Sequence, residues 1–187
     1  MAKHIVWGLL ATLMSAPLMA QQPPTRSPPP VAAPPAASLP VVEFAFEERA
    51  TLSPAVVVGE TALGRRQYIP ITGGTVTGPK FKGEIIPGGW DYQLTSASGC
   101  NALSADYFLK AEDGTVIHIL NQALMCPGDS PEAGRTYVHP QFEAPKGKYE
   151  WMTRATFVGT LETETAAAAP GAAPVLKAVR IKFYQIK

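Results

Sequence analysis

Short β-rich runs, separated by Gly, Pro and Asp, make up almost the whole sequence from residue 41 onward. Helical periodicity is nearly absent there, so the alternation of apolar and polar residues predicts strands. This density of short strands favours an antiparallel sheet that either curls closed or folds into a sandwich. The expected strands lie near 41–49, 54–59, 67–76, 79–86, 90–97, 103–111, 115–123, 136–143, 149–160 and 175–186.

Glycines mark the places where this sheet is expected to turn or bend. The stretch GPKFKGEIIPGGWDYQL, residues 78–94, alternates like a strand, stops at Pro87-Gly88-Gly89 and starts again at Trp90. We interpret it as a hairpin, with its glycines supplying a turn, a bulge or a close backbone approach. The Ala-rich stretch 162–174 has the composition of a flexible loop between the last two strands.

The first forty residues are expected to lie outside the fold. Residues 1–20 combine a short basic start, an apolar run and small residues ending at Ala20, which is typical of a secretory signal peptide. The apolar run is too short for a lasting transmembrane helix. Residues 21–40 hold eight prolines and no aromatic residue, which predicts a disordered linker. We therefore expect a secreted protein, in the bacterial periplasm, with one folded domain at 41–187.

The charge of the mature chain limits the partners that it could have. The full sequence has 16 basic and 15 acidic side chains, and removal of the signal peptide takes away Lys3 and leaves 15 of each. A net charge of zero without basic clusters argues against nucleic acid or an anionic membrane as partner. No later apolar stretch approaches membrane-spanning length, so we expect no membrane span in the mature chain. The sequence does not indicate an oligomeric state.

The two cysteines flank a predicted β-hairpin. Its turn is Glu112-Asp113-Gly114, which places Ala111 opposite Thr115. In that register Cys100 stands opposite Cys126, so an oxidising compartment would allow a structural disulfide. A redox-active pair is the alternative, but the chain has no Cys-x-x-Cys spacing and no basic activator near either cysteine.

Aromatic residues alternate along several predicted strands and share a face in each. If the sheet is closed, strand alternation predicts that they point inward, as a packed core or as the lining of a small-molecule pocket. The excess of Tyr and Trp over Leu keeps the pocket interpretation open. The candidate pocket residues are Trp90, Asp91, Tyr92, Tyr107, Tyr149, Trp151 and Thr153.

Asp91 is the strongest candidate for acid–base chemistry, because aromatic cover near a barrel mouth could raise its pKa. The alternative is an exposed strand carboxylate, or one that caps the Gly88-Gly89 turn and pairs with Arg154. The hairpin register points His118 outward, and two scattered histidines are too few for a metal site. The chain has no nucleophile elbow, zinc-protease motif or phosphate-binding loop. We expect no metal and no cofactor.

Three segments together resemble a known family: RRQYIPITGGTVTGPKFKGEIIPGGWDYQL (65–94), LKAEDGTVIHI (109–119) and FEAPKGKYEWMTRATFVGT (142–160). Their order and spacing resemble the DUF3237 family, also called UPF0311, over nearly all of 41–187. The resemblance implies an all-β fold, a single closed antiparallel β-barrel of about 8–10 strands, similar to calycin-like barrels. It implies little about activity, because the family is largely uncharacterised. Ser104, Asp106 and Thr153 depart from the family pattern.

Three functional hypotheses follow from the sequence. The leading one is a secreted β-barrel that binds a small apolar or aromatic ligand in its interior. The second is an isomerase, cyclase or hydratase that acts on an unsaturated small molecule, which requires an inward titratable group. The third is a structural interaction module, which predicts an exposed apolar patch or an oligomer instead of a cavity.

Overall fold

A computed structural model describes residues 32–33, 35–36, 39–128, 136–166 and 174–187. The chain divides into two compact units, Met1–Ala37 and Ser38–Lys187, and the second contains every strand of the described residues. The expected signal peptide and most of the expected Pro-rich linker lie outside the described residues.

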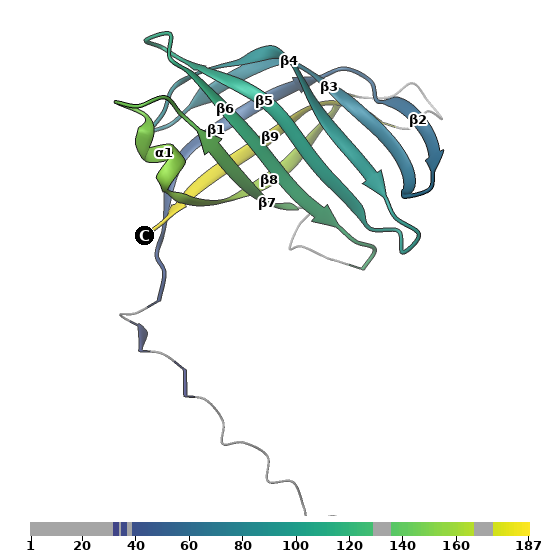
Figure 1. Cartoon of the computed structure of the whole chain (residues 1–187), viewed down its shortest axis with the longest axis horizontal. Coiled ribbons are helices and arrows are strands. Elements are labelled where there is room, and N and C mark those ends of the chain that lie inside the picture. Colours follow the sequence, from purple (N-terminus) through teal and green to yellow (C-terminus); the bar gives the residue numbers. More distant parts are fainter. Residues whose placement is uncertain (1–31, 34, 37–38, 129–135, 167–173) are drawn as a thin grey trace, which may run out of the picture. The chain divides into compact units, whose positions relative to one another are not determined.

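Nine strands and one short helix build the second unit (Figure 1). They are β1 (Val42–Leu52), β2 (Val56–Thr61), β3 (Gly64–Thr77), β4 (Gly83–Thr95), β5 (Asn101–Ala111), β6 (Val116–Met125), β7 (Thr136–Glu143), α1 (Glu150–Arg154), β8 (Thr156–Ala166) and β9 (Val175–Ile186).

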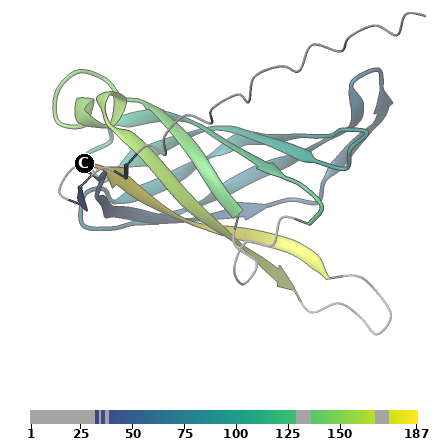
Figure 2. The ribbon, with the colours of Figure 1, turned by 90° about the horizontal axis from the view of Figure 1, so that it is seen from below.

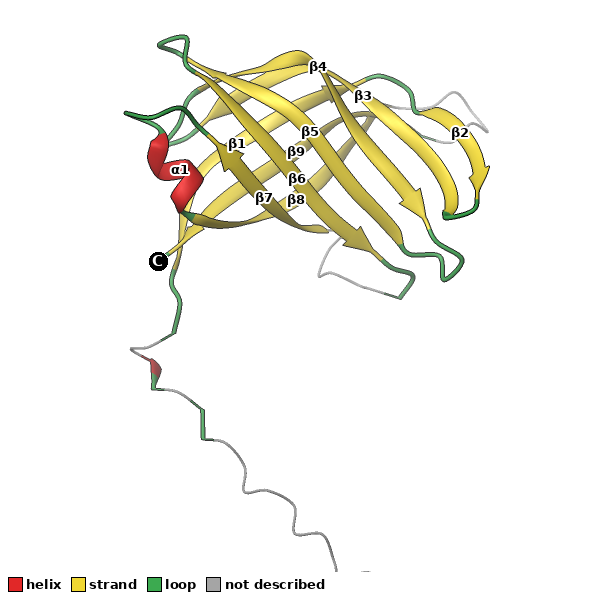
Figure 3. Ribbon diagram, viewed as in Figure 1, coloured by secondary structure: helices red, strands yellow, loops and turns green. Residues whose placement is uncertain are grey.

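The sheet closes on itself (Figure 3). Its order is β1-β9-β8-β7-β6-β5-β4-β3-β2, and an additional pairing of β1 with β3 joins eight of the strands into a ring. Every pairing is antiparallel, and β2 extends β3 as a hairpin outside the ring. The expected closed antiparallel barrel is confirmed, and the sandwich alternative is wrong.

The hairpin expected within 78–94 is wrong, because Gly83–Thr95 is one continuous strand. Its pairing with β5 shifts between Ile86 and Trp90, where two extra residues are accommodated as a bulge. Gly88 has φ +109°, a left-handed conformation that glycine adopts without a steric penalty. The glycines therefore bend the strand and do not end it.

The strand expected at 149–160 is also wrong in its first half. Glu150–Arg154 forms the helix α1, whose Glu150 and Arg154 pair at helical spacing, with Oε2 and Nη2 3.2 Å apart. Tyr149, Trp151 and Thr153 alternate at the strand period, whereas Tyr149 and Met152 are three residues apart, which is a helical spacing. Tertiary packing decides between them, because Met152 is buried against the barrel core.

The β5–β6 hairpin follows the predicted register. Ala111 hydrogen-bonds to Thr115, Tyr107 pairs with Ile119, and Asn101 pairs with Met125. A disulfide joins Cys100 and Cys126 at the open end of this hairpin, as predicted.

The helix α1 lies at one end of the barrel and β2 at the opposite end (Figure 2). Aromatic side chains fill the half of the barrel at the α1 end. Phe46 is fully buried, and its ring lies within 5.0–5.7 Å of three other phenylalanine rings. Edge-to-face and tilted ring pairs of this kind stabilise a core beyond their buried area. The rings of this aromatic plug are those of Phe46, Phe81, Phe142, Tyr149, Phe157 and Phe183.

Candidate functional site

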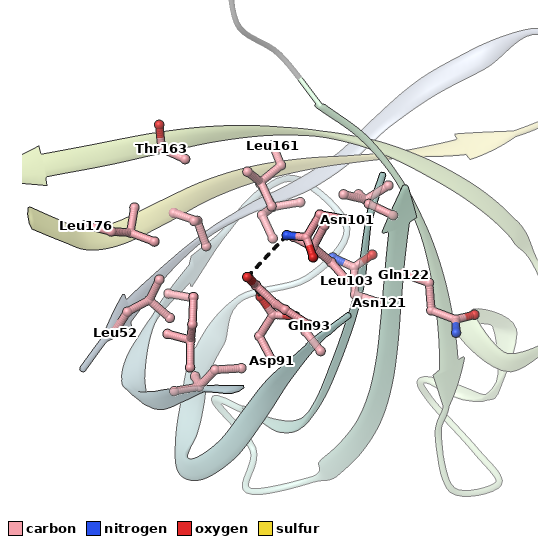
Figure 4. Close-up of a pocket in the computed structure, with 18 of the residues that line it drawn as sticks. Leu52, Asp91, Gln93, Asn101, Leu103, Asn121, Gln122, Leu161, Thr163 and Leu176 are labelled. Atoms are coloured by element: carbon pink, nitrogen blue, oxygen red, sulfur yellow. Dashed lines mark hydrogen bonds between the residues drawn. The ribbon is translucent and has the colours of Figure 1, made fainter. Parts of the chain in front are cut away.

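A cavity of about 400 Å³ occupies the other half of the barrel (Figure 4). Many of its lining residues come from the ends of strands that meet away from α1, such as Leu52, Leu103 and Leu176. The cavity extends to the protein surface, because its lining includes exposed Ala55 and Met125. Such a space has the size of a small-molecule site.

The cavity exists because inward-facing side chains become smaller, or polar, halfway along the strands. In β1 the buried Phe46 is followed, at the same parity, by Glu48 and then by Ala50. In β5 the inward Leu109 and Tyr107 give way to Ala105. The sequence thus fills one half of the barrel with rings and leaves the other half hollow.

A chain of amide groups fixes Asp91 in the cavity wall. Gln67 Nε2 donates to Gln93 Oε1 at 2.8 Å, and Gln93 Nε2 donates to Asp91 Oδ2 at 2.7 Å. Asn101 Nδ2 also donates to Gln93 Oε1, at 3.3 Å. The other carboxylate oxygen, Asp91 Oδ1, is buried and has no hydrogen-bond partner among the described residues. Burial raises the pKa of Asp91, against hydrogen bonds from the Gln93 side chain and the Ser104 backbone.

A second acidic group, Glu48, lies between the cavity and the aromatic plug. A hydrogen bond joins the Tyr107 hydroxyl and Glu48 Oε1, and Tyr107 lines the cavity. Glu48 is fully buried, and burial raises its pKa to about 8. Asn121 also lines the cavity, and its Oδ1, like Glu48 Oε2, lacks a hydrogen-bond partner within the described part of the chain. The cavity therefore combines apolar walls with a few convergent polar groups.

Of the predicted pocket residues, Asp91 and Tyr107 line this cavity. The expected inward orientation of Trp90 and Tyr92 is wrong, because 40% of Trp90 and 45% of Tyr92 is exposed. Parity explains the error: Ile85, Asp91 and Gln93 occupy the inward positions of β4, so the larger residues between them face outward. Trp90 stacks edge-on against Tyr68 there, with ring centroids 5.0 Å apart.

The three remaining predicted residues lie at the α1 end. Tyr149 is buried against Phe81, with ring centroids 5.4 Å apart, and Trp151 packs against Phe157 at 5.8 Å. The Thr153 hydroxyl accepts a hydrogen bond from the Ala144 backbone N–H at 2.8 Å. These residues close the barrel and are not brought together with Asp91.

The predicted orientation of His118 is confirmed. It lies on the outer face, where its Nε2 is 2.7 Å from Asp106 Oδ1 and its Nδ1 is 3.7 Å from Glu143 Oε2. The alternative in which Asp91 pairs with Arg154 is wrong, since Arg154 contacts Glu150. No group of three potential metal ligands occurs within the described ranges. The described helices include none that is long and apolar enough to cross a membrane.

Four polar residues of this site were not predicted from the sequence: Glu48, Gln67, Gln93 and Asn121. A usable signal existed for Glu48, which follows Phe46 at strand spacing and therefore shares its inward face. The bulge between Phe44 and Phe46 hides this pattern in the sequence. It shifts the register, so that Phe44 faces outward although it has the same parity as the inward Phe46 and Glu48. Gln93 likewise lies two residues after Asp91 on β4 and therefore shares its face of the strand.

The fold and the cavity define a small closed β-barrel with a polar group of acids and amides inside an otherwise apolar pocket. The chain matches the family described as "Protein of unknown function (DUF3237)" over residues 40–186, and it belongs to that family.

Similar proteins are known from bacteria and from a fungus. A UPF0311 protein of Clostridium acetobutylicum is 33% identical over 129 residues, covering 62% of this chain and 82% of that protein. A crystal structure of a protein with unknown function from the same organism has a TM-score of 0.64 at 31% identity, covering 79% of this chain and 99% of that one. The hydroalkoxylation enzyme phnH of Penicillium herquei is 28% identical over 121 residues, covering 65% of this chain and 74% of the enzyme.

Proposed function

We propose that this protein binds a small, largely apolar, unsaturated molecule in the barrel cavity and that Asp91 transfers a proton to or from it. The observation that carries the proposal is the Asp91 carboxyl, which borders the cavity with one buried oxygen unpartnered among the described residues. A raised pKa brings a carboxyl closer to the range in which it both gives and takes protons near neutral pH.

Hydroalkoxylation, the addition of an O–H group across a C=C bond, is one reaction that this arrangement supports. The acid form of Asp91 gives its proton to an alkene carbon, and the hydroxyl oxygen of the ligand bonds to the neighbouring carbon. The hydroxyl proton then returns to Asp91, so the residue ends as it began. The fungal relative that carries this activity in its name supports the proposal. An isomerase or hydratase would use the same proton transfer.

Binding without turnover is the second candidate, and the cavity itself favours it. The walls are mostly apolar, and the amide chain from Gln67 to Asp91 offers directional hydrogen bonds along one side. A binding protein needs only these features. The two candidates differ in whether Asp91 is required for a chemical step.

An ortho-prenylphenol tests the proposal, because it contains a hydroxyl and an alkene that can close into a cyclic ether. The purified protein is incubated with this probe in deuterated buffer, and the ether is quantified by chromatography and mass spectrometry. We expect one deuterium in the product at the protonated carbon. We expect Asp91→Asn to lower turnover by about 10²- to 10⁴-fold, the usual contribution of a general acid or base.

Asp106→Asn is the matched control, since Asp106 is an aspartate on the outer face of the neighbouring strand and should retain full turnover. Equal turnover by wild type and Asp91→Asn would contradict catalysis by Asp91. Probe binding without ether formation, detected by ligand-observed NMR, would support the binding candidate.

We also propose that the protein acts outside the cytoplasm, in the periplasm. The support is the sequence pattern of residues 1–20 together with the Cys100–Cys126 disulfide, which is compatible with an oxidising compartment. Fractionation of the native host would test this, and an intact N-terminus in the cytoplasmic fraction would contradict it.

A further inference from the structure

Glu48 is the most unusual residue of the barrel interior. Its side chain is fully buried in β1, and its strand neighbours Val76 and Ile181 are apolar. Among the described residues it has no ion-pair partner, and its only hydrogen bond is to Tyr107. Burying an acid in this way is costly and gives little stability, so a functional reason is expected.

The proton of a neutral Glu48 has two possible positions. On Oε2 it would have no acceptor within the described residues, which leaves a buried donor unsatisfied. On Oε1 it can be donated to the oxygen of the Tyr107 hydroxyl. Tyr107 must then donate its own proton elsewhere. The Asn121 side chain hydrogen-bonds to Tyr107 as a donor, so the acceptor has to come from the cavity, which Tyr107 borders. A proton on Oε1 therefore leaves fewer buried donors without an acceptor, so this position is favoured.

We propose that Glu48 is a positioning residue that, as a neutral acid, donates to the Tyr107 oxygen and so directs the Tyr107 hydroxyl proton into the cavity, toward an acceptor oxygen of the ligand. The chemical class of ligand is therefore an apolar molecule that carries a carbonyl or similar acceptor oxygen. This inference rests on the proposed function only for the location of the ligand.

The direction of the Tyr107 hydroxyl should reverse when Glu48 ionises, since the carboxylate can only accept. Burial sets the pKa of Glu48 at about 8, and burial and then the charge of Glu48 hold that of Tyr107 well above its usual range. Asp91 from β4 is the other titratable group that lines the cavity among the described residues. On the plug side, Tyr149 belongs to the same core cluster. The Asp91→Asn background removes the nearest competing titration.

Two neutral probes of matched shape report whether the Tyr107 hydroxyl donates its proton into the cavity. Acetophenone only accepts hydrogen bonds, and α-methylbenzyl alcohol also donates them. Their affinities are measured by NMR titration in the Asp91→Asn background, at pH 6 and at about pH 9.5. We expect acetophenone to bind about tenfold more weakly at the higher pH, the effect of one hydrogen bond. The alcohol should change much less. Glu48→Gln should abolish the pH effect, and Tyr107→Phe should bind acetophenone weakly at both values.

A second readout does not need a ligand. The ¹³Cζ resonance of Tyr107, assigned with Tyr107→Phe, should move with a midpoint near pH 8 in the Asp91→Asn protein and stay fixed when Glu48→Gln is added. A midpoint that persists without Glu48, or no titration at all, would overturn the inference. If the resonance behaves as expected but neither probe binds any variant, the proposed function fails and the positioning of Tyr107 by Glu48 stands.

Discussion

At the scale of single residues, the buried acid Glu48 should make the stability of the protein fall with rising pH. In the unfolded chain this carboxyl ionises near 4.5, and in the folded barrel its pKa is about 8. Between these values the folded state holds a proton that the unfolded state has lost, so unfolding becomes more favourable as the pH rises. The loss is on the order of 5 kcal/mol over the whole window and levels off above pH 8. Asp91, with its pKa also raised, acts in the same direction.

Glu48→Gln tests this, because glutamine keeps the shape and the polar atoms of the side chain and does not ionise. We expect urea unfolding at about pH 5 and pH 8.5 to give a much smaller difference in unfolding free energy for Glu48→Gln than for wild type. The matched control is Glu47→Gln on the outer face of the same strand, where Glu47 pairs with Arg180 and the wild-type pH dependence should remain. Equal pH dependence of wild type and Glu48→Gln would mean that Glu48 is not the source.

At the scale of secondary-structure elements, the disulfide acts on the open end of the β5–β6 hairpin. Cys100 and Cys126 are 26 positions apart in the sequence, and the adjacent pair Asn101–Met125 is the last of the ladder. Closing a loop of this length stabilises a fold by roughly 3–4 kcal/mol through the unfolded state. We expect dithiothreitol, or the double change Cys100→Ser with Cys126→Ser, to lower the unfolding free energy by that amount. Dithiothreitol should not affect the double variant, and an unchanged wild-type midpoint would contradict the prediction.

The same elements show how far the sequence could predict the structure. The register of the β5–β6 hairpin was predictable to the residue, because a three-residue turn with Gly114 fixes the pairing of everything that follows it. β4 was not, since its inward positions carry Asp91 and Gln93 while Trp90 and Tyr92 face outward. Hydrophobicity alone therefore assigns the wrong face to β4. Bulges such as the one between Phe44 and Phe46 depend on contacts with other strands, which local sequence does not contain.

At the scale of the whole molecule, the barrel is divided into a solid half and a hollow half. The aromatic plug with α1 supplies the packing that stabilises the closed sheet, and the cavity contributes no contacts of its own. A substitution in the cavity should therefore change ligand binding with little effect on the unfolding free energy. Ala105 is the position at which this can be tested, because it lines the cavity and pairs with Asp91 across β4 and β5.

Ala105→Phe should place a ring in the cavity and exclude the ligand. We expect it to abolish binding of the ortho-prenylphenol probe while changing the unfolding free energy by less than about 1.5 kcal/mol, because the ring enters existing space and does not overpack a filled core. Ala102→Phe is the control, since Ala102 lies on the same strand and is exposed, so the variant should bind as wild type does. Thermal and urea unfolding report stability, and ligand-observed NMR reports binding. Undiminished binding by Ala105→Phe would place the ligand outside the barrel and would leave Asp91 without a substrate to protonate.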